Sequence, residues 1–301
     1  MRMCDAHCDT MMKIDEGLTC DFSFEKASAC GGFLQIFACF TEDGESDAYF
    51  AALRKINRFL DFIREKDNCC VAYTPCAAKR ITEAGGLAAV LSLENCACLE
   101  DDPENIYKFY NLGVRCITLT WNGANSFAGG CLERGGLTKR GRDLLQIAGR
   151  LGILVDVSHL NEQSFYDVLS EGSCKVFASH SSCAEINDNP RNLTDLQILK
   201  IYSRGGIVCA CPNPPFLNGS RKAKREEFAQ HIRHIMRLTD GRGAGIGSDC
   251  DGTENCCEWL KTTADYLNFD KVLEENNFTK FEIRDIFSCN FGRFFGICDK
   301  K

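Results

Sequence analysis

Two residues near the start of this sequence have the types and the spacing of metal ligands. His7 and Asp9 lie two positions apart in MRMCDAHCDT, a stretch that is typical of a short strand. Because residues i and i+2 of a strand point to the same face, this imidazole and carboxylate would converge. A lone H-x-D pair is more often a turn histidine beside a solvated acid. The interpretation as ligands therefore depends on the other histidines.

Two of the remaining four histidines end apolar runs. His159 ends GILVDVSH and His180 ends KVFASH, and both runs are typical of buried parallel strands. Carboxylates end two similar runs, with Glu94 after AAVLSL and Asp249 after GAGIGS. Each of these residues alone could be an ordinary buried polar group. Together they indicate one site at the ends of several strands.

The last two histidines fit a surface helix better than a site. His231 and His234 lie at helical spacing in the polar stretch REEFAQHIRHIMRL, and we expect both on the surface. The basic cluster SRKAKREE at 220–227 precedes them and is followed by acids, so it predicts the solvated start of that helix.

A closed barrel would position the candidate ligands. Apolar runs alternate with helical patterns along the chain, which predicts parallel strands with crossover helices. The predicted strands are the run around His7 and residues 31–40, 87–95, 114–121, 152–159, 175–180, 205–211 and 243–249. Eight strands predict an α/β fold, a (β/α)8 TIM-type barrel over about residues 1–252 with C-terminal helices over about 254–301. We expect one domain, with the candidate ligands at the C-terminal face where such barrels place their active sites.

Apolar residues at helical spacing define the predicted helices. The stretch 47–66 places Phe50, Leu53, Ile56, Leu60 and Ile63 on one face, which predicts an amphipathic helix packed on the sheet. In the tail, FTKFEIRDIFSCNFGRFFG carries aromatic residues that we expect to pack against the barrel.

Composition narrows the class of protein. A net charge of −7 and a pI near 5.4 argue against a nucleic-acid or membrane surface, since both need clustered basic charge. No apolar run is long enough to cross a bilayer, and no signal peptide or lipid-anchor signal is seen. The 21 cysteines include no C-x-x-C pair, which favours free, mostly buried thiols in a reducing compartment. We therefore expect a cytoplasmic protein.

The donor set predicts the metal. Imidazole nitrogens with carboxylate oxygens suit zinc or another divalent first-row ion. Five or six ligands are too many for one tetrahedral catalytic ion but suit two ions that share a carboxylate. Glu94 stands on a strand without a histidine and is the natural bridge. We expect two divalent ions per chain, Zn²⁺ or another first-row metal.

Six motifs in this order carry a resemblance to a known family: DAHCD, LSLEN, VRCITLTWN, GILVDVSH, FASHSSC followed by NPRN, and GIGSDCDG. They resemble the membrane dipeptidase (renal dipeptidase-like) family of amidohydrolase-fold metallopeptidases, from residue 5 to residue 296. The resemblance implies a binuclear zinc site in a distorted barrel and hydrolysis of dipeptides by a metal-bound hydroxide. In lacking recognisable signal and anchor sequences, the chain resembles the soluble bacterial-type members of this family.

The resemblance also implies roles for individual residues. His7, Asp9 and Glu94 would hold one ion, and Glu94, His159 and His180 the other. Asp249 matches the family's acid/base aspartate. Arg191 in NPRN matches the arginine that holds the substrate's free carboxylate, a bidentate task suited to guanidinium. Taken alone, Arg191 would be read as a surface ion pair.

Two positions depart from the family pattern. The fourth strand of well-known members ends in T-L-T-H, whose histidine helps to hold the oxyanion, and Trp121 stands there in this chain. Indole donates only through its ring nitrogen, so a metal ion, Asn122 or Asn125 would have to stabilise the oxyanion. We expect Trp121 and Asn122 to contact the substrate. The seventh strand has CPNPP in place of the family's aromatic pocket residue.

Two alternatives remain open. The first is an amidohydrolase that acts on another amide, a lactone or a phosphotriester; such relatives bridge their metals with a carboxylated lysine after strand four, and no lysine occurs from 109 through 138. The second is a metal-binding protein without peptidase activity, which Trp121 makes plausible. A homodimer is an expectation carried by the resemblance alone.

Overall fold

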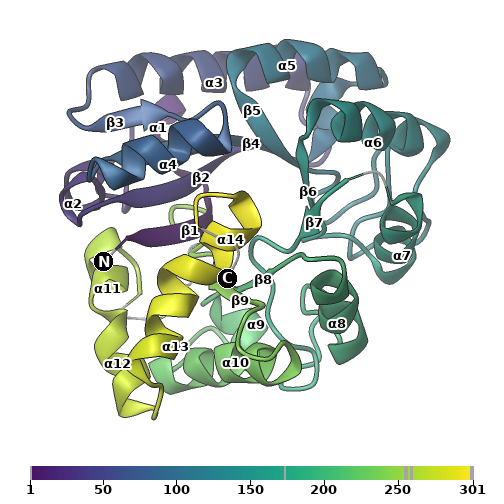
Figure 1. Cartoon of the computed structure of the whole chain (residues 1–301). Helices are drawn as coiled ribbons and strands as arrows, with labels where there is room; N and C mark the ends of the chain where they lie inside the picture. The colour runs from purple at the N-terminus through teal and green to yellow at the C-terminus, as the bar shows by residue number, and fades with distance from the viewer. Residues whose placement is uncertain (1, 173, 254–256, 258–259, 299–301) are drawn as a thin grey trace.

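The computed structural model describes residues 2–172, 174–253, 257 and 260–298, in which strands and helices alternate (Figure 1). The strands are β1 (Met3–Cys8), β2 (Phe33–Phe40), β3 (Cys69–Val71), β4 (Leu87–Glu94), β5 (Val114–Thr118), β6 (Leu154–Asp156), β7 (Val176–Phe177), β8 (Val208–Ala210) and β9 (Ala244–Ile246). Each of the eight predicted strands has its counterpart, although most are shorter than predicted. The short strand β3 was not predicted.

Parallel pairing closes the strands into a barrel. One sheet runs in the order β1-β2-β4-β5-β6-β7, and β8 pairs with β9. Ala178 and Val208 form a bridge between the β7 and β8 segments, and Cys8 and Cys250 form one between β1 and the segment after β9. β3 pairs only with the start of β4, outside this ring. The predicted TIM-type α/β barrel is confirmed.

Helices cover the outside of the barrel (Figure 1). They are α1 (Thr10–Glu16), α2 (Phe24–Ala29), α3 (Ala48–Arg64), α4 (Pro75–Glu83), α5 (Ile106–Leu112), α6 (Lys139–Leu151), α7 (Glu162–Glu171), α8 (Asp195–Ser203), α9 (Pro214–Asn218), α10 (Arg225–Leu238), α11 (Thr263–Leu267), α12 (Phe269–Glu275), α13 (Lys280–Arg284) and α14 (Asn290–Phe295). A π-helical segment, Asp285–Cys289, joins the last two. Short 3₁₀ turns lie at Cys96–Leu99 and Pro103–Asn105. In the described ranges, no helix is both long and apolar enough to cross a membrane.

Capping side chains and glycines set the helix ends as the local sequence requires. The Asn161 side chain accepts a hydrogen bond from the Ser164 N–H (2.8 Å) at the start of α7. Gly152 ends α6 with φ of 69°, a left-handed conformation that glycine adopts without steric cost. These ends fix how α6 and α7 connect to β6 and β7, and therefore where His159 and His180 emerge.

Helix α3 buries the stripe that spacing predicted, except at Phe50. Ala52, Ile56 and Phe59 are fully buried, whereas Phe50 is 68% exposed. Because Phe50 lies two residues from Ala52, about 200° around the helix, it points to solvent. The inclusion of Phe50 in the packed face was wrong, although the helix and its packing were correct.

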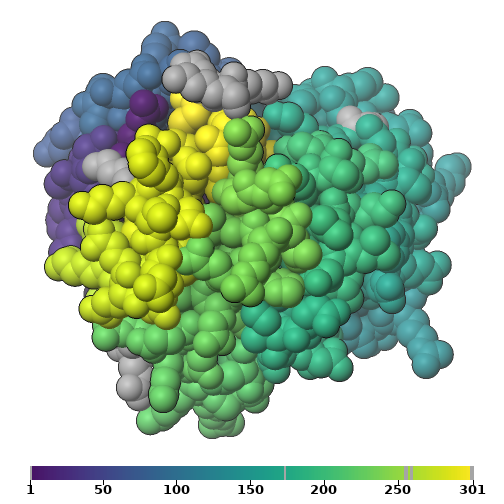
Figure 2. Space-filling view, turned by 60° about the horizontal axis from the view of Figure 1, so that its bottom comes forward, coloured from purple at the N-terminus to yellow at the C-terminus, as the bar shows by residue number. Residues whose placement is uncertain are grey.

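The last helix, α14, packs onto the barrel at the end opposite the site. Phe291, Phe294, Phe295 and Ile297 join a buried cluster with side chains from the starts of strands, such as Cys4. Figure 2 shows this yellow segment in continuous contact with the green part of the chain. The tail aromatics therefore serve packing as expected, except Phe281, which is 73% exposed.

His231 is a core residue, contrary to the prediction of a surface position. Its side chain has no exposed surface. Its Nδ1 accepts the N–H of Cys183 (3.0 Å), and its Nε2 lies 3.0 Å from the carbonyl oxygen of Leu217. The inner face of α10 packs on the barrel, and the helical period places His231 on that face. His234 is half-buried and contacts Asp195 at 2.6 Å.

Candidate metal centre

The six candidate residues lie at the C-terminal ends of the barrel strands. His7 is in β1, Asp9 follows it directly, and Glu94 is the last residue of β4. The other three each lie three residues beyond a strand: His159 after β6, His180 after β7 and Asp249 after β9. Parallel strands bring these ends to one face, so residues far apart in the sequence meet there.

Glu94 lies at the centre of the group. Its Oε2 is 3.1 Å from Nε2 of His7, and its Oε1 is 3.1 Å from Nε2 of His159. Nε2 of His180 lies 3.9 Å from the same Oε1 and 2.9 Å from Nε2 of His159. The two carboxylate oxygens of Glu94 therefore face different histidines.

Two aspartates complete the side of the group around His7. Nε2 of His7 lies 3.4 Å from Oδ2 of Asp9 and 3.9 Å from Oδ1 of Asp249. Gly252 makes this approach possible, since a Cβ there would lie 2.0 Å from Oδ2 of Asp9 and 2.6 Å from Oδ1 of Asp249. The chain thus needs glycine where the two acids converge.

Left-handed backbone aims two of these side chains inward. His159 has φ of 69° and Asp249 has φ of 55°. Such values are uncommon for residues other than glycine and cost about 1 kcal/mol or more each. Both residues lie three positions beyond the regular strands, so the predicted strands extended too far at these two ends.

The group fits a cation. His7, Asp9, Glu94, His159, His180 and Asp249 are all at most 8% exposed. Nε2 of His7, Oδ1 of Asp9 and Oε2 of Glu94 are buried without a hydrogen-bond partner among the described residues. Buried polar atoms normally have hydrogen-bond partners. Nitrogen and oxygen atoms that converge without such partners fit as ligands of divalent metal ions. Two ligand groups within 4.8 Å are Glu94 with His159 and His180, and His7 with Asp9 and Asp249.

The crowded charges perturb each other without a metal. Burial, together with the charge of Asp9, raises the pKa of Asp249 to about 8. Burial and the charge of Glu94 raise the pKa of Asp9 to about 6. Burial opposes protonation of His7, but the charges of Glu94 and Asp9 outweigh it and raise the pKa of His7 well above its usual value. Such large pKa shifts in one cleft are typical of functional sites.

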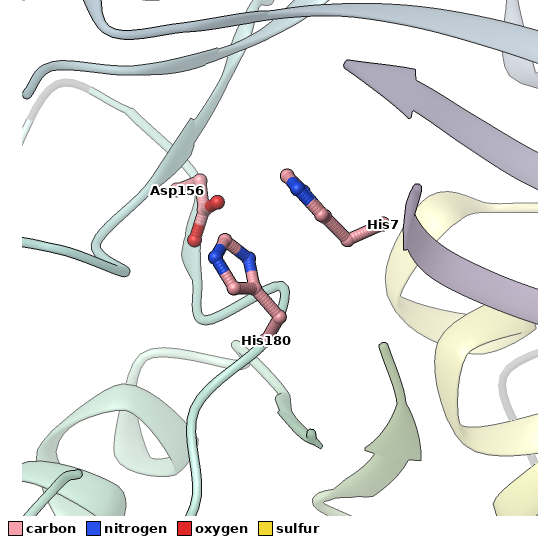
Figure 3. Close-up of side chains that lie close together, drawn as sticks. All are labelled: His7, Asp156 and His180. Atoms are coloured by element: carbon pink, nitrogen blue, oxygen red, sulfur yellow. The ribbon is translucent and has the colours of Figure 1, made fainter. Parts of the chain in front are cut away.

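The outer nitrogens of the histidines are held by partners that the sequence analysis did not identify. Nδ1 of His159 lies 3.0 Å from Oδ1 of Asn122, and Nδ1 of His180 lies 2.6 Å from Oγ of Ser179. Asp156, in β6, has a carboxylate oxygen within 4.8 Å of ring nitrogens of both His7 and His180 (Figure 3). A carboxylate within the apolar run ILVDV was the only sequence signal for it.

Asp156 is an orienting residue rather than a free ligand. Its Oδ1 accepts the N–H groups of Ser158 (3.0 Å) and Ser179 (2.9 Å). Its Oδ2 accepts the hydroxyl of Thr118 (3.0 Å) and that of Ser179. Four donors occupy the carboxylate, which leaves it little capacity for a metal.

A cavity of about 440 Å³ opens over the group. Besides the site residues, its wall includes Met12, Phe40, Glu42, Trp121, Asn122, Arg191, Asn213, Pro215 and Phe216. Phe216 supplies an aromatic wall shortly after the CPNPP stretch. The volume of the cavity is in the range of small-molecule binding sites.

Arg191 is buried in this wall rather than paired at the surface. Only 7% of it is exposed, and one terminal N–H donates to the carbonyl oxygen of His180 (3.2 Å). Its guanidinium lies 5.1 Å from the centre of the Phe216 ring. Within the described part of the chain, its Nε has no hydrogen-bond partner and no carboxylate pairs with it.

Trp121 and Asn125 differ in their surroundings. The Trp121 ring packs edge-on against Phe40 at 5.2 Å and lies in the cavity wall, 6.5 Å from the His159 ring. The Asn125 amide instead donates to Leu119 (2.7 Å) and to Asn95 (2.9 Å) and is not in the wall. The structure therefore removes Asn125 from the candidates for oxyanion stabilisation.

Sequence comparisons with known proteins identify the family. The sequence profile of the membrane dipeptidase family, peptidase family M19, matches residues 1–300. An uncharacterized dipeptidase of Schizosaccharomyces pombe is 28% identical over 299 residues, covering 92% of this chain and 72% of its own. Dipeptidase verJ of Clonostachys rogersoniana is 29% identical over 218 residues, covering 68% of this chain and 55% of its own.

Solved structures show the same fold at lower identity. A metallopeptidase from Rhodobacter sphaeroides, liganded with a phosphinate mimic of the dipeptide L-Ala-D-Ala, superposes with a TM-score of 0.90 at 20% identity, covering 98% of this chain and 99% of that one. A dipeptidase of family M19 superposes with a TM-score of 0.91 at 21% identity, covering 98% of each chain. The profile match confirms the resemblance carried by the six motifs and the expectation of a metal-dependent hydrolase: the chain belongs to the membrane dipeptidase family, peptidase family M19.

Proposed function

We propose that this chain is a binuclear zinc dipeptidase. The observation that carries the proposal is the position of Glu94, whose Oε2 faces His7 and whose Oε1 faces His159, each at 3.1 Å. A carboxylate with one oxygen toward each of two ligand groups is suited to bridge two ions. His7, Asp9 and Glu94 would hold one ion, and Glu94, His159 and His180 the other. When bound, such ions supply Lewis-acid chemistry and activate water for attack on a carbonyl.

Asp249 would handle the proton. Its Oδ1 lies 3.9 Å from Nε2 of His7, and the residue lines the cavity. A carboxylate in this position can accept a proton from the attacking water and give it to the leaving amine. We assign Asp249 this acid/base role.

Arg191 would select a free carboxylate. Its buried guanidinium stands in the cavity wall beside His180 with no acidic partner among the described residues. A buried cation without a counter-ion is costly, and a substrate carboxylate would compensate it with bidentate hydrogen bonds. Trp121 and Phe216 would enclose the rest of a small substrate, and Asn122 would hold His159 while bordering it. The phosphinate dipeptide mimic bound by the Rhodobacter sphaeroides relative supports a dipeptide as substrate.

A dipeptide screen with elemental analysis tests this proposal. We expect about two zinc ions per chain, turnover of dipeptides with a free carboxylate, and loss of turnover on chelation that zinc restores. Glu94→Gln should weaken both sites, whereas His180→Ala should mainly weaken one. A single ion per chain that excess zinc does not increase would refute the binuclear centre.

The carboxylate contact needs its own test. Amidation of the substrate carboxylate and the substitution Arg191→Met should each lower kcat/KM. Each loss should correspond to about 2 to 4 kcal/mol of activation free energy, the scale of a bidentate charged contact. Together they should cost little more than either alone. Additive losses would remove Arg191 from this role, and turnover only of lactones or other amides would favour a different amidohydrolase.

The expectation of a homodimer stays a prediction, which light scattering would test.

A further inference from the structure

Ser179 lies between the two halves of the candidate centre. Its hydroxyl oxygen is 2.6 Å from Nδ1 of His180 and 3.4 Å from Nδ1 of His7, and it also contacts Oδ2 of Asp156. The residue is 1% exposed, and the rings of His7 and His180 are tilted by 30° with their centres 3.8 Å apart. One buried hydroxyl thus contacts a histidine from each proposed metal site.

Hydrogen-bond accounting sets the direction of these contacts. A serine hydroxyl has one hydrogen to donate and two lone pairs to accept with. The carboxylate oxygen of Asp156 can only accept, so the hydroxyl hydrogen points to it. The lone pairs of Ser179 then accept, and besides the two imidazole nitrogens only Oγ of Ser158 lies near them among the described residues, at 3.5 Å. A neutral imidazole that donates to Ser179 must carry its hydrogen on Nδ1. This direction leaves Nε2 of both His7 and His180 free as a ligand atom.

Thr118 reinforces the arrangement. Its hydroxyl donates to the same Oδ2 of Asp156 at 3.0 Å, and the backbone N–H groups of Ser158 and Ser179 fix Oδ1. The carboxylate therefore cannot rotate away from Ser179 without breaking buried hydrogen bonds. Groups that bind the outer ring nitrogen of a metal-ligating histidine raise its basicity and fix its orientation.

We propose that Ser179, oriented by Asp156, is a shared positioning residue that presets His7 and His180 as Nδ1–H tautomers and so couples the two metal sites. The inference rests on the proposed binuclear centre and adds to it a device that serves both ions at once. His231 provides an internal reference of the opposite kind: its Nδ1 accepts an N–H from Cys183, so its hydrogen must be on Nε2.

Ring-nitrogen NMR of the zinc-loaded wild type tests the tautomers directly. The chain has only five histidines, so long-range proton–nitrogen spectra can be assigned by single substitutions. We expect Nδ1–H for His7 and His180 and Nε2–H for His231. An Nε2–H tautomer at either His7 or His180 would overturn the inference, whatever any variant does.

Metal affinity tests the coupling. We expect Ser179→Ala to weaken zinc binding at both sites by about 10- to 100-fold, measured by competition with a chelator, and to change the visible spectrum of the cobalt-loaded protein. Ser182→Ala is the matched control: this serine is equally buried on the same segment, but its hydroxyl donates to the carbonyl oxygen of Cys211 (3.0 Å). The control should lower the melting temperature and leave both metal affinities unchanged.

The outcomes separate this inference from the proposed function. Wild-type protein that binds no zinc refutes both. Wild-type protein that binds two zinc ions and hydrolyses dipeptides, while Ser179→Ala binds zinc as tightly, refutes only the role of Ser179. Weakening confined to the site that contains His180 would show that Ser179 serves one histidine, which would overturn the shared role.

Discussion

Single residues at this site are constrained by contacts that no motif displays. The candidate ligands could be predicted from the sequence because histidines and acids at the ends of apolar runs are unusual, and because six motifs occur in family order. Asp156 and Ser179 could not, since their importance lies in which nitrogens and oxygens they contact across three strands. The same holds for His231, whose helical spacing suggested a surface position although it is fully buried.

Gly252 illustrates such a constraint and gives a prediction. Its backbone is outside the left-handed region, so alanine is acceptable except that its Cβ would meet Oδ2 of Asp9 at 2.0 Å. We expect Gly252→Ala to displace Asp9 and to lower zinc affinity about 10- to 100-fold, the range for disturbed ligand positioning. Chelator competition measures this, with circular dichroism to verify folding. A folded variant with unchanged affinity would show that Asp9 can move without leaving the metal.

Trp121 gives a second prediction at this scale. It stands in the cavity wall where well-known relatives carry a histidine, and indole has a single donor. We expect Trp121→His to raise kcat on a simple dipeptide by up to about 100-fold, the scale of one added oxyanion donor. Trp121→Phe is the control, because it keeps an aromatic wall without a donor and should give no gain. If the wild type is inactive and Trp121→His creates no turnover, the dipeptidase proposal should be abandoned.

At the scale of elements, the sequence predicted which segments are strands better than where they end. Periodicity identified all eight barrel strands, but the regular strands end three residues before His159 and Asp249, whose left-handed backbone the apolar pattern does not reveal. The strand β3 has only three residues, too few for a recognisable period. Phe50 was misplaced because several stripes of α3 carry apolar side chains, and only packing decides between them.

An ion cluster between α1 and α3 gives a prediction with a pH dependence. Asp15 accepts hydrogen bonds from Arg54 (3.0 Å) and from Arg58 (2.9 Å). Partial burial raises the pKa of Asp15, but the two guanidinium groups outweigh this and hold its pKa below the usual value. A lowered pKa stabilises the fold above the unfolded value of about 3.9, and this stability is lost as the pH falls through the folded value.

We therefore expect Asp15→Asn to lower the free energy of unfolding by about 1 kcal/mol at pH 7, since the arginines are half exposed. The difference from wild type should shrink below about pH 4 and disappear at lower pH. Urea unfolding at several pH values measures it. Asp61→Asn, in the exposed pair of Asp61 with Arg64, is the control and should change stability by less than about 0.5 kcal/mol. An effect of Asp15→Asn that persists at pH 2 would contradict the electrostatic explanation.

At the scale of the whole molecule, the C-terminal helices and the barrel share one core. The sequence predicted that the tail aromatics would pack, but it could not show that α14 contributes to the cluster at the starts of the strands. That cluster joins Cys4, from the first strand, to Phe291 near the end of the described chain. We propose on this basis that the chain unfolds as one unit, in line with the expected single domain.

Phe291 provides the test of that shared core. It is 1% exposed and packs against Phe177 and Phe294. We expect Phe291→Ala to lower the free energy of unfolding by about 3 to 5 kcal/mol in a single transition. Phe281→Ala, with the side chain 73% exposed on α13, should change it by less than about 0.5 kcal/mol. Two separate transitions, with only one affected by Phe291→Ala, would indicate that the tail and the barrel unfold independently.

The seam between β1 and the segment after β9 has a consequence for how the protein is made. Asp9 donates its N–H to Cys250 at 2.8 Å, so the first strand finds its second neighbour about 240 residues later in the chain. During synthesis on the ribosome, β1 and β2 emerge early and wait with an open edge and an uncovered apolar face. Closure of the barrel needs contacts between residues that are far apart in the sequence, and such contacts form slowly. We therefore expect the nascent chain to be prone to aggregate until the segment after β9 has emerged, and chaperone binding would protect it during that interval.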